Sequence, residues 1–131
     1  MPHAKTNDVR LILITAPNET TAGEIAEALV AQRLAACINL VPGLNSIYRW
    51  RGKIQHDREC LLLVKTRASA VNLVVETTRK LHPYRLPEII AIEVSGGLKT
   101  YLSWVKRSVK PANSQNIQPE SPIKATPTKR K

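Results

Sequence analysis

The stretch Leu81-His82-Pro83-Tyr84-Arg85-Leu86-Pro87-Glu88-Ile89-Ile90 separates two regular elements of the chain. Its prolines, Pro83 and Pro87, exclude it from a helix interior or a central strand, because proline has no backbone N–H and a fixed φ. Each proline also biases the residue before it toward extended geometry. The sequence therefore predicts a stiff extended connector. It groups an imidazole, a phenol, a guanidinium and a carboxylate, so we interpret it either as part of a polar site or as a rigid packing loop.

Regular elements are predicted on both sides of this connector. A helix capped by Ser69 is expected before it, because apolar residues recur at helical spacing over residues 71–81. The β-branched residues of this segment leave a strand as the alternative. After the connector, residues 88–95 alternate as in a strand, and an amphipathic helix is expected over residues 98–109.

The first part of the chain predicts a strand followed by a helix. Residues 9–15 form a short apolar run with β-branched residues, which is typical of a buried strand. Thr21 and Glu24 match a capping box, in which the two side chains satisfy free amides of a first helical turn. Apolar residues then recur at helical spacing, so we expect the helix to run to about Leu34.

Two long extended segments, residues 37–49 and 53–66, occupy the middle of the chain. Val41-Pro42-Gly43 interrupts the first, where we expect a bulge or bend, and Trp50-Arg51-Gly52 predicts a tight turn between the two. Paired segments of this length reach about 44 Å at about 3.4 Å per residue, more than a small domain can cover. Their tip, residues 46–59, should overhang and leave open strand edges, which a symmetric oligomer can pair.

The predicted order is strand, helix, strand, strand, helix, strand, helix. Its first six elements match the ferredoxin-like split βαβ fold, an α+β sandwich with two helices on one face of an antiparallel sheet. The last helix is an addition to that fold. We expect a flexible arm over residues 1–8, one ferredoxin-like domain over residues 9–110, and a disordered, basic, proline-rich tail over residues 111–131.

Composition places the chain among ordinary globular proteins. Its 131 residues are 43% hydrophobic and include no Phe, which predicts an aliphatic core. No apolar run approaches the roughly 20 residues of a membrane helix, and the N-terminus lacks the apolar segment of a signal peptide. We therefore expect a cytoplasmic protein without membrane contact. The net charge of +10 supports weak polyanion binding, but the central strands lack aromatics that would recognise RNA specifically.

Motifs for catalysis are absent from the sequence, which contains no nucleophile elbow, P-loop, GxGxxG or HExxH pattern. We therefore do not expect an enzyme. A metal site would use imidazole, thiolate or carboxylate groups. The candidate ligands are His56, His82, Cys37, Cys60, Glu59 and Glu88. None forms a local chelating pair, so ligands would have to converge from separate elements or subunits. For the two cysteines, which both lie in apolar surroundings, we expect buried free thiols rather than metal ligands.

Several segments of the chain resemble the CutA divalent-cation tolerance proteins. The match runs in order along residues 9–109 and leaves out both termini. Its segments are Thr15-Ala16-Pro17, Leu34-Ala35-Ala36-Cys37, the hairpin from Val41 to Ile54, residues 59–66, His82-Pro83-Tyr84 with Pro87-Glu88-Ile89, and Tyr101-Leu102 with Trp104. The probability that this many segments match in the same order by chance is very small.

The resemblance implies a ferredoxin-like homotrimer whose long hairpins pair across subunits and form clefts at the interfaces. It also implies a role in copper tolerance, with Cu(II) binding in some members and no reaction. Some relatives that bind copper have a Cys and a second His at the positions of Ile14 and Leu81. Only His82 of that set remains, and the nearby Arg85 disfavours a bound cation. We therefore expect no tightly bound metal, but weak binding of Cu(II) or another divalent cation, with His82 and Cys37 as ligands.

An interface cleft is the best site for a ligand, and we place in it Trp50, Lys65, Tyr84 and Glu88. Lys65 and Glu88 can pair or hold a polar ligand; the alternative is that these residues only lock the trimer. The preferred function is divalent metal ion (copper) tolerance by weak metal binding. The alternative is a trimeric scaffold, or a small-molecule sensor like the nitrogen-regulatory PII trimers, without catalytic or metal-binding activity.

Overall fold

The computed structural model of the chain describes residues 8–111. The elements follow in the predicted order: β1 (Val9–Ala16), α1 (Glu19–Ala31), β2 (Cys37–Trp50), β3 (Lys53–Arg67), a 3₁₀ turn (Ala68–Ala70), α2 (Val71–Leu81), β4 (Ile89–Glu93) and α3 (Lys99–Ser108). The predicted arm over residues 1–8 and tail over residues 111–131 lie outside the described residues, apart from Asp8 and Pro111.

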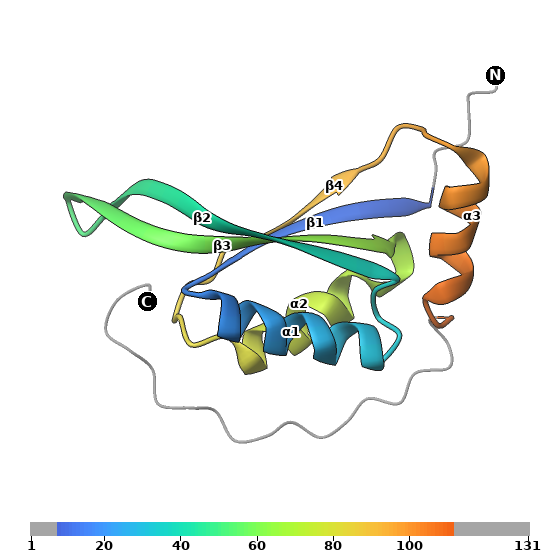
Figure 1. Cartoon of the computed structure of the whole chain (residues 1–131), viewed down its shortest axis with the longest axis horizontal. Coiled ribbons are helices and arrows are strands. Elements are labelled where there is room, and N and C mark those ends of the chain that lie inside the picture. The colour runs from blue at the N-terminus through green and yellow to red at the C-terminus, as the bar shows by residue number, and fades with distance from the viewer. Residues whose placement is uncertain (1–7, 112–131) are drawn as a thin grey trace.

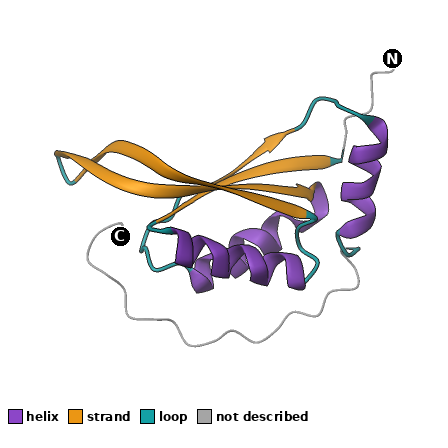
Figure 2. Ribbon diagram, in the orientation of Figure 1, coloured by secondary structure: helices purple, strands orange, loops and turns teal. Residues whose placement is uncertain are grey.

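The strands form one antiparallel sheet in the order β2-β3-β1-β4. Helices α1 and α2 cover one face of this sheet, and α3 lies at the end opposite the tip of the β2–β3 hairpin (Figure 1, Figure 2). The predicted α+β, ferredoxin-like fold with an added C-terminal helix is therefore confirmed.

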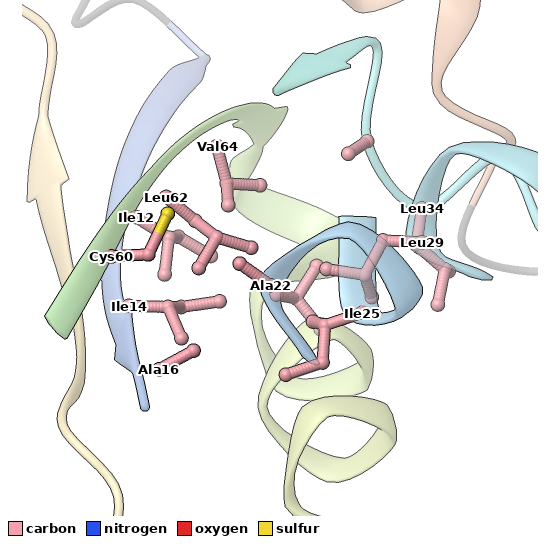
Figure 3. Packing of buried hydrophobic residues seen from close by; sticks show 12 residues of the cluster. Ile12, Ile14, Ala16, Ala22, Ile25, Leu29, Leu34, Cys60, Leu62 and Val64 are labelled. Carbon is pink, nitrogen blue, oxygen red and sulfur yellow. The ribbon is translucent and has the colours of Figure 1, made fainter. Parts of the chain in front are cut away.

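The core lies between the sheet and α1, and apart from the thiol of Cys60 its side chains are aliphatic, as the absence of Phe predicts (Figure 3). Ile12 and Ile14 of β1 and Leu62 of β3 point toward Ile25 and Leu29 of α1, and all five are fully buried. Burying a side chain of this size stabilises the fold by about 1.5–3 kcal/mol. This packing fixes which residues of β1 and β3 face the helices.

The β2–β3 hairpin overhangs the domain, as its length predicts (Figure 1). β1 pairs with β3 only from Ala16 opposite Cys60 to Val9 opposite Arg67, so residues 53–59 have a neighbour on one side alone. β2 is the last strand of the sheet, so its outer edge has no neighbouring strand within residues 8–111. Edges of this kind can pair with a strand of another chain.

A bulge in β2 decides which side chains share a face of the hairpin. The pairing register shifts between Val41 and Leu44, where β2 has one residue more than β3, and this confirms the irregularity predicted at Val41-Pro42-Gly43. One extra residue exchanges the two faces for the rest of the strand. As a result, Tyr48 and Trp50 lie on the same face as Glu59 of β3.

The hairpin turn consists of two residues in the left-handed region, Arg51 at φ 54° and Gly52 at φ 79°. Positive φ at both positions is the signature of a type I′ turn, whose twist matches that of the paired strands. The Arg51 guanidinium lies 5.9 Å from the ring centroid of Trp50. The tight turn predicted for Trp50-Arg51-Gly52 is confirmed.

The predicted helix starts were wrong at two places. Helix α1 begins at Glu19, and the side chain of Asn18 accepts a 2.8 Å hydrogen bond from the backbone N–H of Thr21. Thr21 therefore lies inside the helix and does not cap it. Ser69 lies in the 3₁₀ turn before α2, whose N-cap residue, Ala70, makes no side-chain hydrogen bond.

Candidate functional site

The sheet face opposite α1 and α2, here called the open face, carries an apolar patch where β1, β3 and β4 pair. Its apolar side chains are Leu11, Leu13, Leu61, Leu63, Ile90 and Ile92. Ile90 and Ile92 of β4 are 50% and 43% exposed. Exposed apolar side chains that are contiguous in this way are typical of surfaces that contact another molecule.

The connector after α2 is tied to β1 through His82, which is 3% exposed. The Nδ1 atom of His82 accepts a 3.1 Å hydrogen bond from the backbone N–H of Tyr84, so the ring proton lies on Nε2. Nε2 donates a 2.7 Å hydrogen bond to the carbonyl oxygen of Thr15. Both ring nitrogens of His82 are thus engaged, and a metal ion could bind this predicted ligand only by displacing one of these partners.

The connector is tied to β3 through Tyr84, whose hydroxyl donates a 2.6 Å hydrogen bond to Oε2 of Glu59. The rings of His82 and Tyr84 are in contact, with centroids 4.6 Å apart. Sequence reasoning did not identify this carboxylate as the partner of Tyr84. The sequence feature that could have identified it is a charged residue at the point where β3 becomes apolar on both faces. A carboxylate that is buried there requires a hydrogen-bond donor.

The predicted cleft residues lie on separate parts of one chain, Trp50 and Lys65 on the open face and Tyr84 and Glu88 in the connector before β4. Trp50 lies at the hairpin tip opposite Lys53, and Lys65 lies near the other end of β3, about 40 Å away at about 3.4 Å per residue. The Lys65 ammonium donates to Oδ1 of Asn39. Glu88 is exposed just before β4. One chain therefore does not bring these residues together, and the cleft stays a prediction that needs a second subunit.

The Trp50 indole is a donor without an acceptor among residues 8–111. Its Nε1 atom is buried from solvent, and no hydrogen-bond partner for it lies within the described chain. A buried N–H of this kind costs free energy unless something accepts its hydrogen bond. A ligand or another subunit at the hairpin tip can supply that acceptor.

The two cysteines are free and differ in burial. Cys60 is buried in the core, and burial raises the pKa of its thiol, with a smaller contribution from the charge of Glu19. Cys37 is half-buried at the start of β2, opposite Lys65. Burial raises the pKa of Tyr101 on α3, and its neighbour Cys37 adds to this effect, first through its charge. The half-buried Cys37 corrects the expectation that both thiols are buried.

The metal ligands considered from the sequence do not converge in one chain. Across residues 8–111, no three side chains among His, Cys, Asp and Glu are grouped closely enough to hold a metal ion. In the same part of the chain, no helix is long and apolar enough to cross a membrane.

The sequence profile of the CutA1 divalent ion tolerance protein family matches residues 10–108. The chain belongs to the CutA1 family. This match confirms the resemblance found in the hairpin and in the His82-Pro83-Tyr84 connector. The family's name describes tolerance of divalent ions and specifies no reaction.

Relatives of this CutA1-family chain come from bacteria, animals and plants. The divalent-cation tolerance protein CutA of Thermus thermophilus is 50% identical over 98 residues, which are 75% of this chain and 95% of the relative. The protein CutA of Mus musculus is 48% identical over 97 residues, 74% of this chain. The matched region spans only 55% of the mouse protein.

Solved CutA structures have the same fold. The CutA structure from Xylella fastidiosa superposes with a TM-score of 0.77 at 48% identity, covering 79% of this chain and 99% of that chain. A CutA from Archaeoglobus fulgidus, described as periplasmic, superposes with a TM-score of 0.75 at 37% identity, covering 78% and 99% of the two chains. These similarities establish the CutA fold for this chain.

Proposed function

We propose that this chain is a non-catalytic, cytoplasmic homotrimer that acts in tolerance of divalent metal ions, copper among them, by weak metal binding. Its membership of the CutA1 divalent ion tolerance family carries this proposal. The expected ligands are His82 and Cys37.

The open strand edges and the open face support self-association. Residues 53–59 on one side, and β2 on its outer side, have no neighbouring strand among residues 8–111, and natural proteins cover or pair such edges. The exposed Ile90 and Ile92 add an apolar surface next to the pairing edges. A closed symmetric assembly can bury both features at once, because each subunit offers the same edge and the same face.

The hydrogen bonds of His82 support weak rather than tight metal binding. A metal ion at Nδ1 would replace the hydrogen bond from the Tyr84 N–H, and a metal ion at Nε2 would replace the hydrogen bond to Thr15. Either exchange costs the free energy of an existing buried hydrogen bond. The cation of Arg85, three residues away, opposes a second positive charge there.

Native mass spectra of the full chain, recorded with and without one equivalent of Cu(II) or Zn(II), test both the trimeric state and the metal ligands. We expect a trimer that gains discrete metal masses, with the gain reduced in His82→Gln and in Cys37→Ser. His56→Gln, at an exposed position of the hairpin, is the matched control and should leave the gain unchanged. A monomer would contradict the subunit assignment, and equal uptake by all variants would contradict the ligand assignment.

A trimeric scaffold or a PII-like small-molecule sensor is the second candidate. The engaged nitrogens of His82 and the absence of a three-ligand cluster within residues 8–111 favour it. The Trp50 indole N–H, which has no acceptor in that range, also fits an interface cleft that takes a polar ligand. A rise in melting temperature with ATP but not with Cu(II) would support the sensor.

A further inference from the structure

The overhanging hairpin presents a second face, on the same side of the sheet as α1 and α2. Side chains alternate along β3, so Ile54, His56 and Arg58 point to the side where Cys60 and Leu62 are buried against the helices. The helices do not reach this part of the hairpin (Figure 1). We call the six residues on this side the tip face: Asn45, Ile47, Arg49, Ile54, His56 and Arg58.

The tip face has an apolar centre that is strongly exposed. Ile47 is 66% exposed and Ile54 is 62% exposed, more than any other isoleucine of the described chain. Ile47 lies opposite His56, and Ile54 lies opposite Arg49, so the two isoleucines are diagonal neighbours on adjacent strands. Their side chains thus form one continuous apolar patch.

Two cations border this patch. Arg58 of β3 lies opposite Asn45 in the row before the isoleucines, and Arg49 of β2 lies beside Ile54 in the last row, so the two are about 14 Å apart, four residues along the strands and one strand across. Neither arginine forms an ion pair within residues 8–111. The nearby carboxylate of Asp57 points to the other face, where it accepts a hydrogen bond from the Tyr48 hydroxyl.

The surface is hollowed beside these residues. A cavity of about 290 Å³ is lined by Asn45, Ile47, His56 and Arg58 of the tip face, and by Ser46 and Asp57, which lie between them on the two strands and belong to the other face. A hollow of this size on a paired two-stranded ribbon holds a few side chains of another chain rather than a whole cofactor. The neighbouring cations at Arg51 and Lys53 strengthen the positive potential around it.

We propose that the tip face docks an acidic, extended segment of a partner protein. The spacing of Arg49 and Arg58 fits two carboxylates four residues apart in an extended chain, since such residues are about 13 Å apart and point the same way. The residue midway between them points the same way too, and an apolar side chain there contacts Ile47 and Ile54. The tip face is separate from the strand edges and the open face that the proposed trimer uses.

Fluorescence anisotropy of the full chain tests this docking surface. The probe is a fluorescein-labelled peptide, Gly-Glu-Thr-Leu-Thr-Glu-Gly, which has the required pattern. We expect saturable binding by the wild-type chain. The affinity should fall about ten-fold in Arg49→Glu/Arg58→Glu, which removes the complementary charges. It should fall by about the same factor in Ile47→Ser, which removes the apolar contact. Replacing the peptide's leucine by serine should weaken binding as Ile47→Ser does.

Arg79→Glu/Lys80→Glu, at exposed positions of α2, makes the same change of net charge and should leave binding unchanged. Arg49→Ala is the milder variant if the double substitution fails to fold. Equal loss in the two double variants, or no saturable binding by the folded wild-type chain, would overturn the proposal. A change of native mass in Ile47→Ser would also overturn it, because the tip face would then be a contact between copies of this chain.

Discussion

The hydroxyl of Tyr84 donates a 2.6 Å hydrogen bond to Oε2 of Glu59, and both side chains are almost fully buried. This contact fastens the connector between α2 and β4 to the middle of β3. His82, two residues earlier, fastens the same connector to Thr15 at the end of β1. The connector is therefore rigid because two buried polar contacts hold it, in addition to its prolines.

Tyr84→Phe should destabilise the protein by about 1–3 kcal/mol, because it removes a donor from a buried carboxylate and leaves the ring in place. Chemical unfolding at one fixed protein concentration measures the change, since concentration affects the stability of an oligomer. Glu59→Gln in the same background should recover part of the loss, because an amide is less costly to bury than a carboxylate. Equal stability of wild type and Tyr84→Phe would show that this hydrogen bond contributes nothing net.

Asn18→Ala should destabilise the protein by about 1 kcal/mol, because Asn18 accepts the hydrogen bond that begins α1. Thr21→Ala is the matched control and should change the stability by much less, since Thr21 lies within the first turns of the helix and not at its cap. Thermal unfolding of the two variants decides between the two possible helix starts. A larger loss in Thr21→Ala would favour the capping box and contradict the observed helix start.

Local sequence patterns predicted the element order, the bulge and the hairpin turn, because each depends on residues close together in the chain. The start of α1 was missed for the same reason. Asn18 and Thr21 are both favourable cap residues three positions apart, and a local pattern does not rank them. The pairing of β1 with β3 ends at Ala16, and the end of this strand places Asn18 at the N-cap of α1.

The contacts of the candidate site were less predictable than the fold. Tyr84 and Glu59 are 25 residues apart, and His82 and Thr15 are 67 apart, so their meeting depends on tertiary structure. The bulge was predicted, but not its consequence that Tyr48 and Trp50 share the face of Glu59. That consequence requires the exact pairing register, which the hydrophobic pattern of an overhanging ribbon specifies weakly.

Gly52→Ala should destabilise the protein by about 1 kcal/mol, because Gly52 has a φ of 79° in the hairpin turn. Gly23→Ala in α1 is the matched control and should stabilise it by about 1 kcal/mol, because alanine favours a helix interior. An added Cβ meets no heavy atom within 4 Å at either position, so backbone conformation alone sets the opposite signs. Changes of the same sign in thermal unfolding would contradict this account.

Raising the pH above about 9 should destabilise the protein partly through Cys60, because burial raises the pKa of its thiol above the ordinary value of 9.0. The thiol of the unfolded chain then loses its proton first, so the unfolded state binds fewer protons and stability falls as the pH rises toward the higher pKa of the folded thiol. Below pH 9 this contribution is constant. Urea unfolding between pH 8 and 10.5 measures this effect. The free energy of unfolding should fall less steeply with pH in Cys60→Ala than in wild type. The loss of the side chain itself lowers the stability of the variant by the same amount at every pH and does not change this slope. Parallel declines would show that Cys60 does not contribute.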